Sequence, residues 1–252
     1  MARRGYIHKL IFPPRCAACR ELLPFDAEGG DSVLCLDCRA SWEKEKLRKC
    51  PECGRAMIDC ICMPDNLRNA GCAALFRLSE YDAENFYGTV NSIVNNLKRS
   101  NDKDDFNFFA GQIASALRLK LEKYALEPSD VIVTYAPRSR SARGDYGFDQ
   151  SELLATEVAL SMGAELRRLI VRRFRLFDRR QKKLGVYGRE KNARRALRAA
   201  GGEHNVKGRA VVVVDDVITT GATTSVCVEI LRSMGAGTVF CACISTAGSM
   251  KD

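Results

Sequence analysis

The stretch Arg209–Ala236, RAVVVVDDVITTGATTSVCVEILRSMGA, decides the fold. Its four consecutive valines predict a strand that is buried on both faces, and a helix is expected over 223–234. Asp215 and Asp216 stand between them, at the carboxyl end of the strand. Ligands of open α/β sheets bind beyond the carboxyl ends of the strands. The stretch therefore predicts a parallel sheet and also the edge at which that sheet carries its site.

The rest of the chain repeats this alternation of strand and helix. Short apolar runs predict the other strands, and apolar side chains at helical spacing predict the helices between them. The pattern is typical of the α/β fold class, in which helices flank both faces of a mostly parallel sheet. The expected strands cover 72–78, 130–135, 206–215 and 238–245, and the expected helices cover 85–98, 106–124, 150–162 and 223–234.

The turn after the acidic pair has the chemistry of a phosphate site. A glycine permits close approach of a ligand, and the N–H groups of a helix N-terminus attract a dianion. Asp215 and Asp216 can accept hydrogen bonds from ribose hydroxyls and hold Mg²⁺ through water. The alternative is a purely structural acidic turn, which is unfavourable without a cation or hydroxyl donors. The predicted ribose 5-phosphate ligands are Thr219, Thr220, Gly221, Ala222 and Thr223.

Residues Val213–Thr223 resemble the phosphoribosyl pyrophosphate motif of the type I phosphoribosyltransferases. The resemblance implies that fold, a Mg²⁺-dependent site for phosphoribosyl pyrophosphate, and displacement of pyrophosphate from the anomeric carbon. It assigns the catalytic carboxylates near the sugar to Asp215 and Asp216. It also implies a basic hood over the substrate, for which the stretch 172–183 is the candidate. The turn after the strand over 130–135 is the candidate pyrophosphate loop, with Pro137, Arg138 and Ser139 as ligands.

A second resemblance narrows the family to the ComF proteins and covers nearly the whole chain. Residues Arg143–Ala155 resemble the R-G-F-N-Q-x-E-L-L-A block of that family, and the segments at Tyr87–Gly88, Asn96–Lys98 and 178–192 resemble others. This resemblance implies an association with competence, the uptake of transforming DNA. Three residues depart from the family pattern, namely Thr134, Tyr146 and Asp178. All three lie on the expected pyrophosphate and acceptor sides, so the sequence favours binding of the sugar phosphate over catalytic turnover.

The first 69 residues form a cysteine-rich module, followed by a phosphoribosyltransferase domain over 70–252. A module of this size buries too little apolar surface to be stable without a metal or disulfides. The C-x-x-C spacing and the lack of a secretory signal favour structural Zn²⁺. Two alternatives stay open: the two sets of four ligands interleave, or the thiols are free. The predicted ligands are Cys16, Cys19, Cys35, Cys38, Cys50, Cys53, Cys60 and Cys62.

Positive charge is concentrated in one part of the chain. The chain carries +9 overall, and the segment 166–209 alone holds 16 Lys and Arg against three acidic residues. This concentration favours an anionic partner, either polyphosphate or nucleic acid, and the alternative is a solvated charged loop. No apolar run approaches the roughly 20 residues of a membrane span, and no signal peptide is recognisable. We therefore expect a cytoplasmic protein.

Two functions follow as alternatives. The first is an enzyme that transfers phosphoribose to an unknown acceptor. The second is a non-catalytic single-stranded DNA-binding protein that uses the phosphoribosyl pyrophosphate site as a sensor. The expected partners are phosphoribosyl pyrophosphate, single-stranded DNA, the DNA-uptake machinery and a second copy of the chain as a homodimer. The basic segment offers few aromatic side chains for base stacking, namely Phe174, Phe177 and Tyr187.

Overall fold

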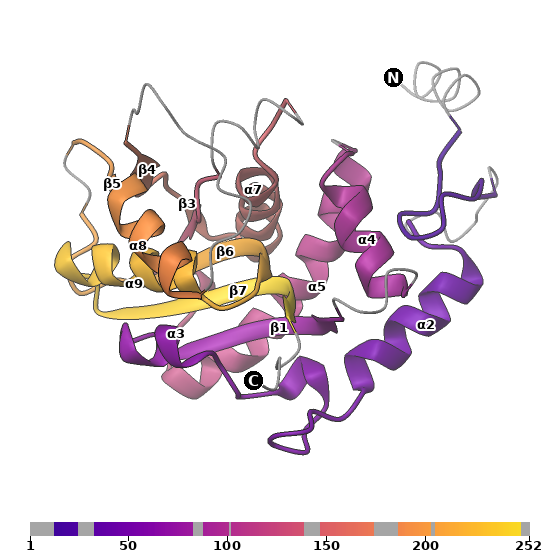
Figure 1. Ribbon diagram of the computed structural model, residues 1–252, viewed down its shortest axis with the longest axis horizontal. Coiled ribbons are helices and arrows are strands. Elements are labelled where there is room, and N and C mark those ends of the chain that lie inside the picture. Colours follow the sequence, from indigo (N-terminus) through magenta and orange to yellow (C-terminus); the bar gives the residue numbers. More distant parts are fainter. Residues whose placement is uncertain are drawn as a thin grey trace.

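A five-stranded parallel sheet forms the centre of the computed structural model (Figure 1). The structure describes residues 13–24, 33–82, 88–100, 102–138, 147–173, 186–202 and 205–247. The strand order is β1-β7-β6-β2-β3, and each neighbouring pair is parallel, so the expected α/β class is confirmed. The strands are β1 (Ala74–Tyr81), β2 (Val131–Tyr135), β3 (Glu165–Leu166), β6 (Ala210–Ile218) and β7 (Thr238–Ala247).

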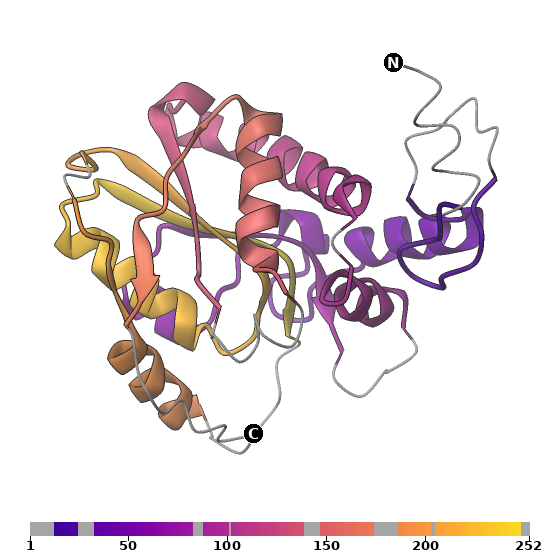
Figure 2. The same cartoon turned by 90° about the horizontal axis from the view of Figure 1, so that it is seen from above.

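The valine run explains why β6 lies inside the sheet. Residues Val211–Val214 are fully buried, and successive side chains of a strand face opposite sides. The two even-numbered valines share a hydrophobic core with one set of helices, and the two odd-numbered valines share a second core with another set. The three layers are visible in Figures 1 and 2. The first set of helices is α2 (Leu36–Leu47), α4 (Thr89–Leu97), α5 (Lys103–Leu121) and α7 (Gln150–Met162), and the second is α3 (Asp65–Asn69), α8 (Val186–Ala196) and α9 (Ala222–Ser233).

The strand register brings two segments to one edge of the sheet. Tyr135 at the end of β2 pairs with Val214 of β6, and Asp215 pairs with Cys243 of β7. The residues that follow β2 therefore lie beside the last residues of β6. The strand expected over 206–215 starts later and continues to Ile218, so the acidic pair lies within the strand and not beyond it. The helix expected over 150–162 has those bounds.

Several elements escaped prediction because each buries few apolar side chains. Helix α2 (Leu36–Leu47) buries only Trp42 among its residues, so it shows no apolar stripe. The others are the helices α3 and α8 (Val186–Ala196), the edge strand β3, the antiparallel pair β4 (Ile170–Arg172) and β5 (Leu197–Ala199), and the 3-10 helices η1 (Met57–Asp59), η2 (Glu122–Tyr124) and η3 (Pro128–Asp130).

The cysteine-rich segment shares a core with the helices that cover the sheet. Helix α2 lies beside α4 at one end of the molecule (Figures 1 and 2). Trp42 packs edge-on against Phe109 of α5, with ring centroids 5.3 Å apart, and its indole N–H donates to Gln112 Oε1 at 3.0 Å. A boundary after residue 69 stays a prediction. Within the described parts of the chain, no helix has the length and apolarity to cross a membrane.

Candidate functional site

The acidic pair at the end of β6 is held by neighbouring donors. Asp216 is buried and Asp215 is half-buried. The hydroxyl of Ser151, in the first turn of α7, donates to Asp215 Oδ1 at 2.7 Å, and the N–H of Asp216 donates to the same oxygen at 3.0 Å. Asp216 Oδ1 accepts from the N–H of Val217 at 2.8 Å. The two carboxylates are therefore fixed in place at the sheet edge.

Burial at the sheet edge disfavours a full negative charge on both carboxylates of the pair. Burial and the neighbouring carboxylate of Asp216 raise the pKa of Asp215 to about 8, against the opposing effects of Arg138 and Ser151. At neutral pH the pair therefore retains a proton unless a further cation approaches. Carboxylate oxygens are the ligands that Mg²⁺ prefers, directly or through water. The pair thus fits the donor set of a Mg²⁺-bound ligand.

Arg138 connects the turn after β2 to the acidic pair. Its guanidinium donates to Asp216 Oδ2, and its backbone N–H donates to Asp149 Oδ2 at 3.0 Å. The carbonyl of Pro137 accepts from the guanidinium of Arg172 at 3.3 Å. The structure therefore brings two of the three expected pyrophosphate-loop residues to the site. The third, Ser139, lies outside the described residues.

Lys98 is a further cation at this site, and sequence reasoning assigned it no role. Its carbonyl oxygen, at the end of α4, accepts from Gln150 Nε2 at 2.8 Å, which ties α4 to the start of α7. Burial lowers the pKa of its ammonium group, and the nearby Asp216 carboxylate opposes that shift. The signal in the sequence is the segment Asn96–Lys98, which stands out only through its resemblance to the ComF proteins.

The turn into α9 presents an open helix N-terminus. Gly221 is the N-cap with φ +72°, and among the described residues no side chain caps the helix. The first N–H groups of a helix have no partner within it, so they are available to an anion. Within the predicted ligand set, Thr219 is exposed, Thr220 and Thr223 are half-buried, and Gly221 and Ala222 are buried.

One departure from the family pattern has a structural role. Thr134 is fully buried in β2, and its hydroxyl accepts from the N–H of Leu169 at 3.3 Å. This bond joins β2 to the segment that leads into β4. The other two departures, Tyr146 and Asp178, lie outside the described residues.

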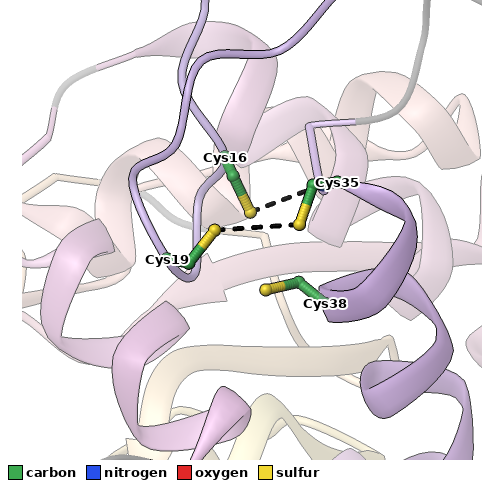
Figure 3. Close-up of side chains that lie close together, drawn as sticks. All are labelled: Cys16, Cys19, Cys35 and Cys38. Carbon is green, nitrogen blue, oxygen red and sulfur yellow. Dashed lines mark hydrogen bonds between the residues drawn. The ribbon is translucent and has the colours of Figure 1, made fainter.

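The cysteines form two separate groups of four in sequence order, and the sets do not interleave. The groups are Cys16, Cys19, Cys35 and Cys38 (Figure 3), and Cys50, Cys53, Cys60 and Cys62. Within each group all sulfur atoms lie within 4.8 Å of one another. The sulfur–sulfur distances are 3.7 Å for Cys19–Cys35, 3.9 Å for Cys50–Cys62 and 3.6 Å for Cys53–Cys60.

These distances fit tetrahedral zinc. A Zn–S bond of about 2.3 Å in a tetrahedron places sulfur atoms roughly 3.8 Å apart, whereas disulfide sulfurs are about 2.05 Å apart. None of the eight cysteines in the two groups forms a disulfide. Each group could therefore hold one Zn²⁺ in a closed set of four ligands.

Part of the basic segment is described, and several of its exposed cations lie on α8 and β5, while Arg168, Arg173 and Lys207 are exposed outside these elements. Lys191, Arg195 and Arg198 are exposed on α8 and β5. Arg194 is neutralised by Glu190 and Glu229. The stretch 174–185, with Phe174 and Phe177, and the side chain of Tyr187 lie outside the described residues.

Comparison with known proteins agrees with this architecture. Residues 109–251 match the phosphoribosyl transferase domain family. A relative named DNA utilization protein YhgH, from Salmonella typhimurium, is 26% identical over 243 residues, which are 93% of this chain and 98% of the relative. The protein of that name from Salmonella typhi is 25% identical over 241 residues, again 93% and 98%.

A solved structure of the allosteric regulatory enzyme of purine biosynthesis is 25% identical over 55% of this chain and 25% of its own, with a TM-score of 0.34. The strand order and the family match, not this score, identify the fold. The chain belongs to the phosphoribosyl transferase domain family, as a ComF-type member with a cysteine-rich module ahead of the domain.

Proposed function

We propose that this chain binds phosphoribosyl pyrophosphate with Mg²⁺ at the edge of the sheet where β6 leads into α9. One observation carries the proposal: two carboxylates, an uncapped helix N-terminus and the cations Arg138 and Lys98 surround the same strand end. Phosphoribosyl pyrophosphate has hydroxyls to match the carboxylates, a 5-phosphate to match the helix N-terminus and a pyrophosphate to match the cations. Membership of the family supports this class of ligand.

In the proposed complex, each part of the ligand meets a different element. The 5-phosphate accepts hydrogen bonds from the first N–H groups of α9 and from the hydroxyls of Thr219, Thr220 and Thr223. Asp215 and Asp216 accept from the ribose hydroxyls. Mg²⁺, when bound, neutralises part of the pyrophosphate charge.

The same groups suit a phosphoribosyl transfer. The bond between C1 of the ribose and the pyrophosphate oxygen breaks with its electron pair on pyrophosphate, and a lone pair of the acceptor bonds to C1. Negative charge then grows on the leaving group and positive charge on the sugar. Arg138 and Lys98 stabilise the first, and the carboxylates of Asp215 and Asp216 stabilise the second. The proposed enzyme is a phosphoribosyltransferase, and no acceptor substrate is assigned to it.

Calorimetric titration with phosphoribosyl pyrophosphate and Mg²⁺ tests the binding. We expect the double variant Asp215→Asn/Asp216→Asn to lose at least tenfold in affinity, which is about 1.4 kcal/mol. Asp104→Asn, an exposed carboxylate at the start of α5, is the matched control and should bind as the wild type does. Equal affinity in the double variant and the wild type would show that the site is misassigned. An assay of pyrophosphate release with a panel of nucleobases then distinguishes the two functions, because an enzyme releases pyrophosphate with its acceptor and a sensor releases none.

A second proposed function is single-stranded DNA binding, favoured by the exposed cations on α8 and β5 and by the name of the Salmonella relatives. We expect log affinity to fall with log salt by about 0.7 per phosphate contact. Arg195→Ala/Arg198→Ala should reduce that slope, whereas Arg194→Ala should not, because acidic partners already neutralise Arg194. An affinity that salt does not change would remove this function.

Four further expectations belong to the proposal: a homodimer, an association with the DNA-uptake machinery, a cytoplasmic location, and a domain boundary after residue 69. Light scattering on the purified chain tests the first, since a dimer doubles the mass of 28.0 kDa. Separate expression of 70–252 tests the last.

A further inference from the structure

The short helix α3 follows the second cysteine group in the chain, packs on α9 and touches the turn that precedes α9. Asn66 Nδ2 donates to the carbonyl oxygen of Thr220 at 3.2 Å. Leu67 is fully buried, in the same hydrophobic core as Ile218 and Val226 on either side of that turn. These contacts join segments that are about 150 residues apart in the sequence.

The packing at Gly221 leaves no room for a side chain between the turn and α3. A Cβ atom at this position would lie 3.2 Å from Leu67 Cγ and 3.3 Å from Pro64 Cβ. Both distances are shorter than ordinary van der Waals contact, so a side chain at this position would force α3 or the turn to move. The position of α3 therefore constrains the backbone whose N–H groups face the proposed phosphate.

The second cysteine group in turn fixes the start of α3. Cys62 precedes Pro64 by two residues. Arg77, buried in β1, donates to the sulfur of Cys60 at 3.2 Å, to the carbonyl oxygen of Cys62, and to the hydroxyl of Thr246 in β7 at 2.7 Å. A cationic donor at a thiolate ligand offsets the negative charge of a four-thiolate site and orients the ligand. The group is thus tied to the sheet by Arg77 and to α3 by the chain.

We propose that the second cysteine group, when it holds Zn²⁺, positions α3 so that α3 sets the conformation of the turn at Thr219–Ala222 for a sugar phosphate. Asn66, Leu67 and Pro64 are then positioning residues, which act through the turn and do not touch the ligand. This inference rests on the proposed function. Coupling between two sites is reciprocal, so ribose 5-phosphate bound at the turn must also strengthen metal binding in the second group.

The test compares Asn66→Ala with Arg68→Ala, an exposed position on the same helix, in the full zinc-loaded chain. Each protein is titrated with ribose 5-phosphate and, separately, with pyrophosphate, both with Mg²⁺. We expect Asn66→Ala to weaken ribose 5-phosphate about fivefold, the contribution of one hydrogen bond, and to change pyrophosphate less than about twofold. Arg68→Ala should change neither.

Metal transfer to a chromophoric chelator provides a readout that is independent of any activity. In the wild type, ribose 5-phosphate should slow the release of about half of the zinc, the half held by the second group, and in Asn66→Ala this protection should be lost. The wild-type measurement alone tests the coupling even where a variant folds poorly.

The outcomes separate the two proposals. Wild-type protein that binds no ribose 5-phosphate would overturn the proposed function and this inference together. Wild-type binding with an unchanged affinity in Asn66→Ala, an equal loss for both ligands, or no protection of zinc would overturn the positioning role alone.

Discussion

Replacing Gly221 with alanine should destabilise the protein more than the same change at Gly163. The two glycines have nearly the same backbone conformation, with φ +72° and +71°. A residue with a Cβ atom in this region costs roughly 1–2 kcal/mol. At Gly163, the C-cap of α7, the added Cβ would meet nothing within 4 Å, whereas at Gly221 it would lie 3.2 Å from Leu67 Cγ. Overpacking of this kind adds about 1–3 kcal/mol.

We therefore expect the free energy of unfolding to fall by about 1–2 kcal/mol in Gly163→Ala and by about 2–5 kcal/mol in Gly221→Ala. Urea denaturation followed by far-UV circular dichroism measures both, at one pH and in the presence of zinc. The difference between the two variants isolates the contact with α3, because the backbone contribution is common to both. Equal losses would refute the close packing of α3 against the turn.

Three further predictions concern charge and metal. Because the pKa of Asp215 is raised, the folded state holds a proton that the unfolded state has released. The free energy of unfolding should therefore fall as the pH rises from about 4 to about 8. Asp215→Asn should flatten this dependence, which urea titrations at several pH values measure. Lys98→Met should weaken binding of pyrophosphate with Mg²⁺ about tenfold or more by calorimetry, whereas Lys103→Met, at an exposed position, should not. Cys38→Ser should remove about half of the zinc, which atomic emission measures, and an undiminished zinc content would contradict the grouping. Cys72→Ser changes a cysteine outside both groups and should keep the full zinc content.

The sheet and its edge could be predicted because local sequence determines them. A run of valines is typical of a strand buried on both faces, and the carboxyl ends of parallel strands meet at one edge, so the sequence alone places Asp215 and Asp216 there. The spacing of the cysteines indicates two sets of four, but spacing alone leaves open whether those sets interleave. The sulfur positions decide this, since Cys50 lies with Cys62 and not with Cys16.

Contacts between distant segments were beyond the sequence. Gly221 was expected to give room to a ligand, and the structure shows that it also gives room to Leu67 and Pro64 of α3. Lys98 reaches the site because Gln150 holds the end of α4 against α7, a contact between residues 52 positions apart. Such pairings depend on how helices pack on the sheet, which no local pattern encodes.

The position of the 5-phosphate in a crystal structure with phosphoribosyl pyrophosphate and Mg²⁺ tests most directly whether the end of β6 is the binding site. We predict that this phosphate lies within hydrogen-bond distance of the N–H groups of Ala222, Thr223 and Thr224, with the ribose hydroxyls on Asp215 and Asp216. We also predict that the guanidinium of Arg138 turns from Asp216 to the pyrophosphate. A ligand found on the basic residues of α8 and β5, with the turn before α9 free of phosphate, would contradict this assignment.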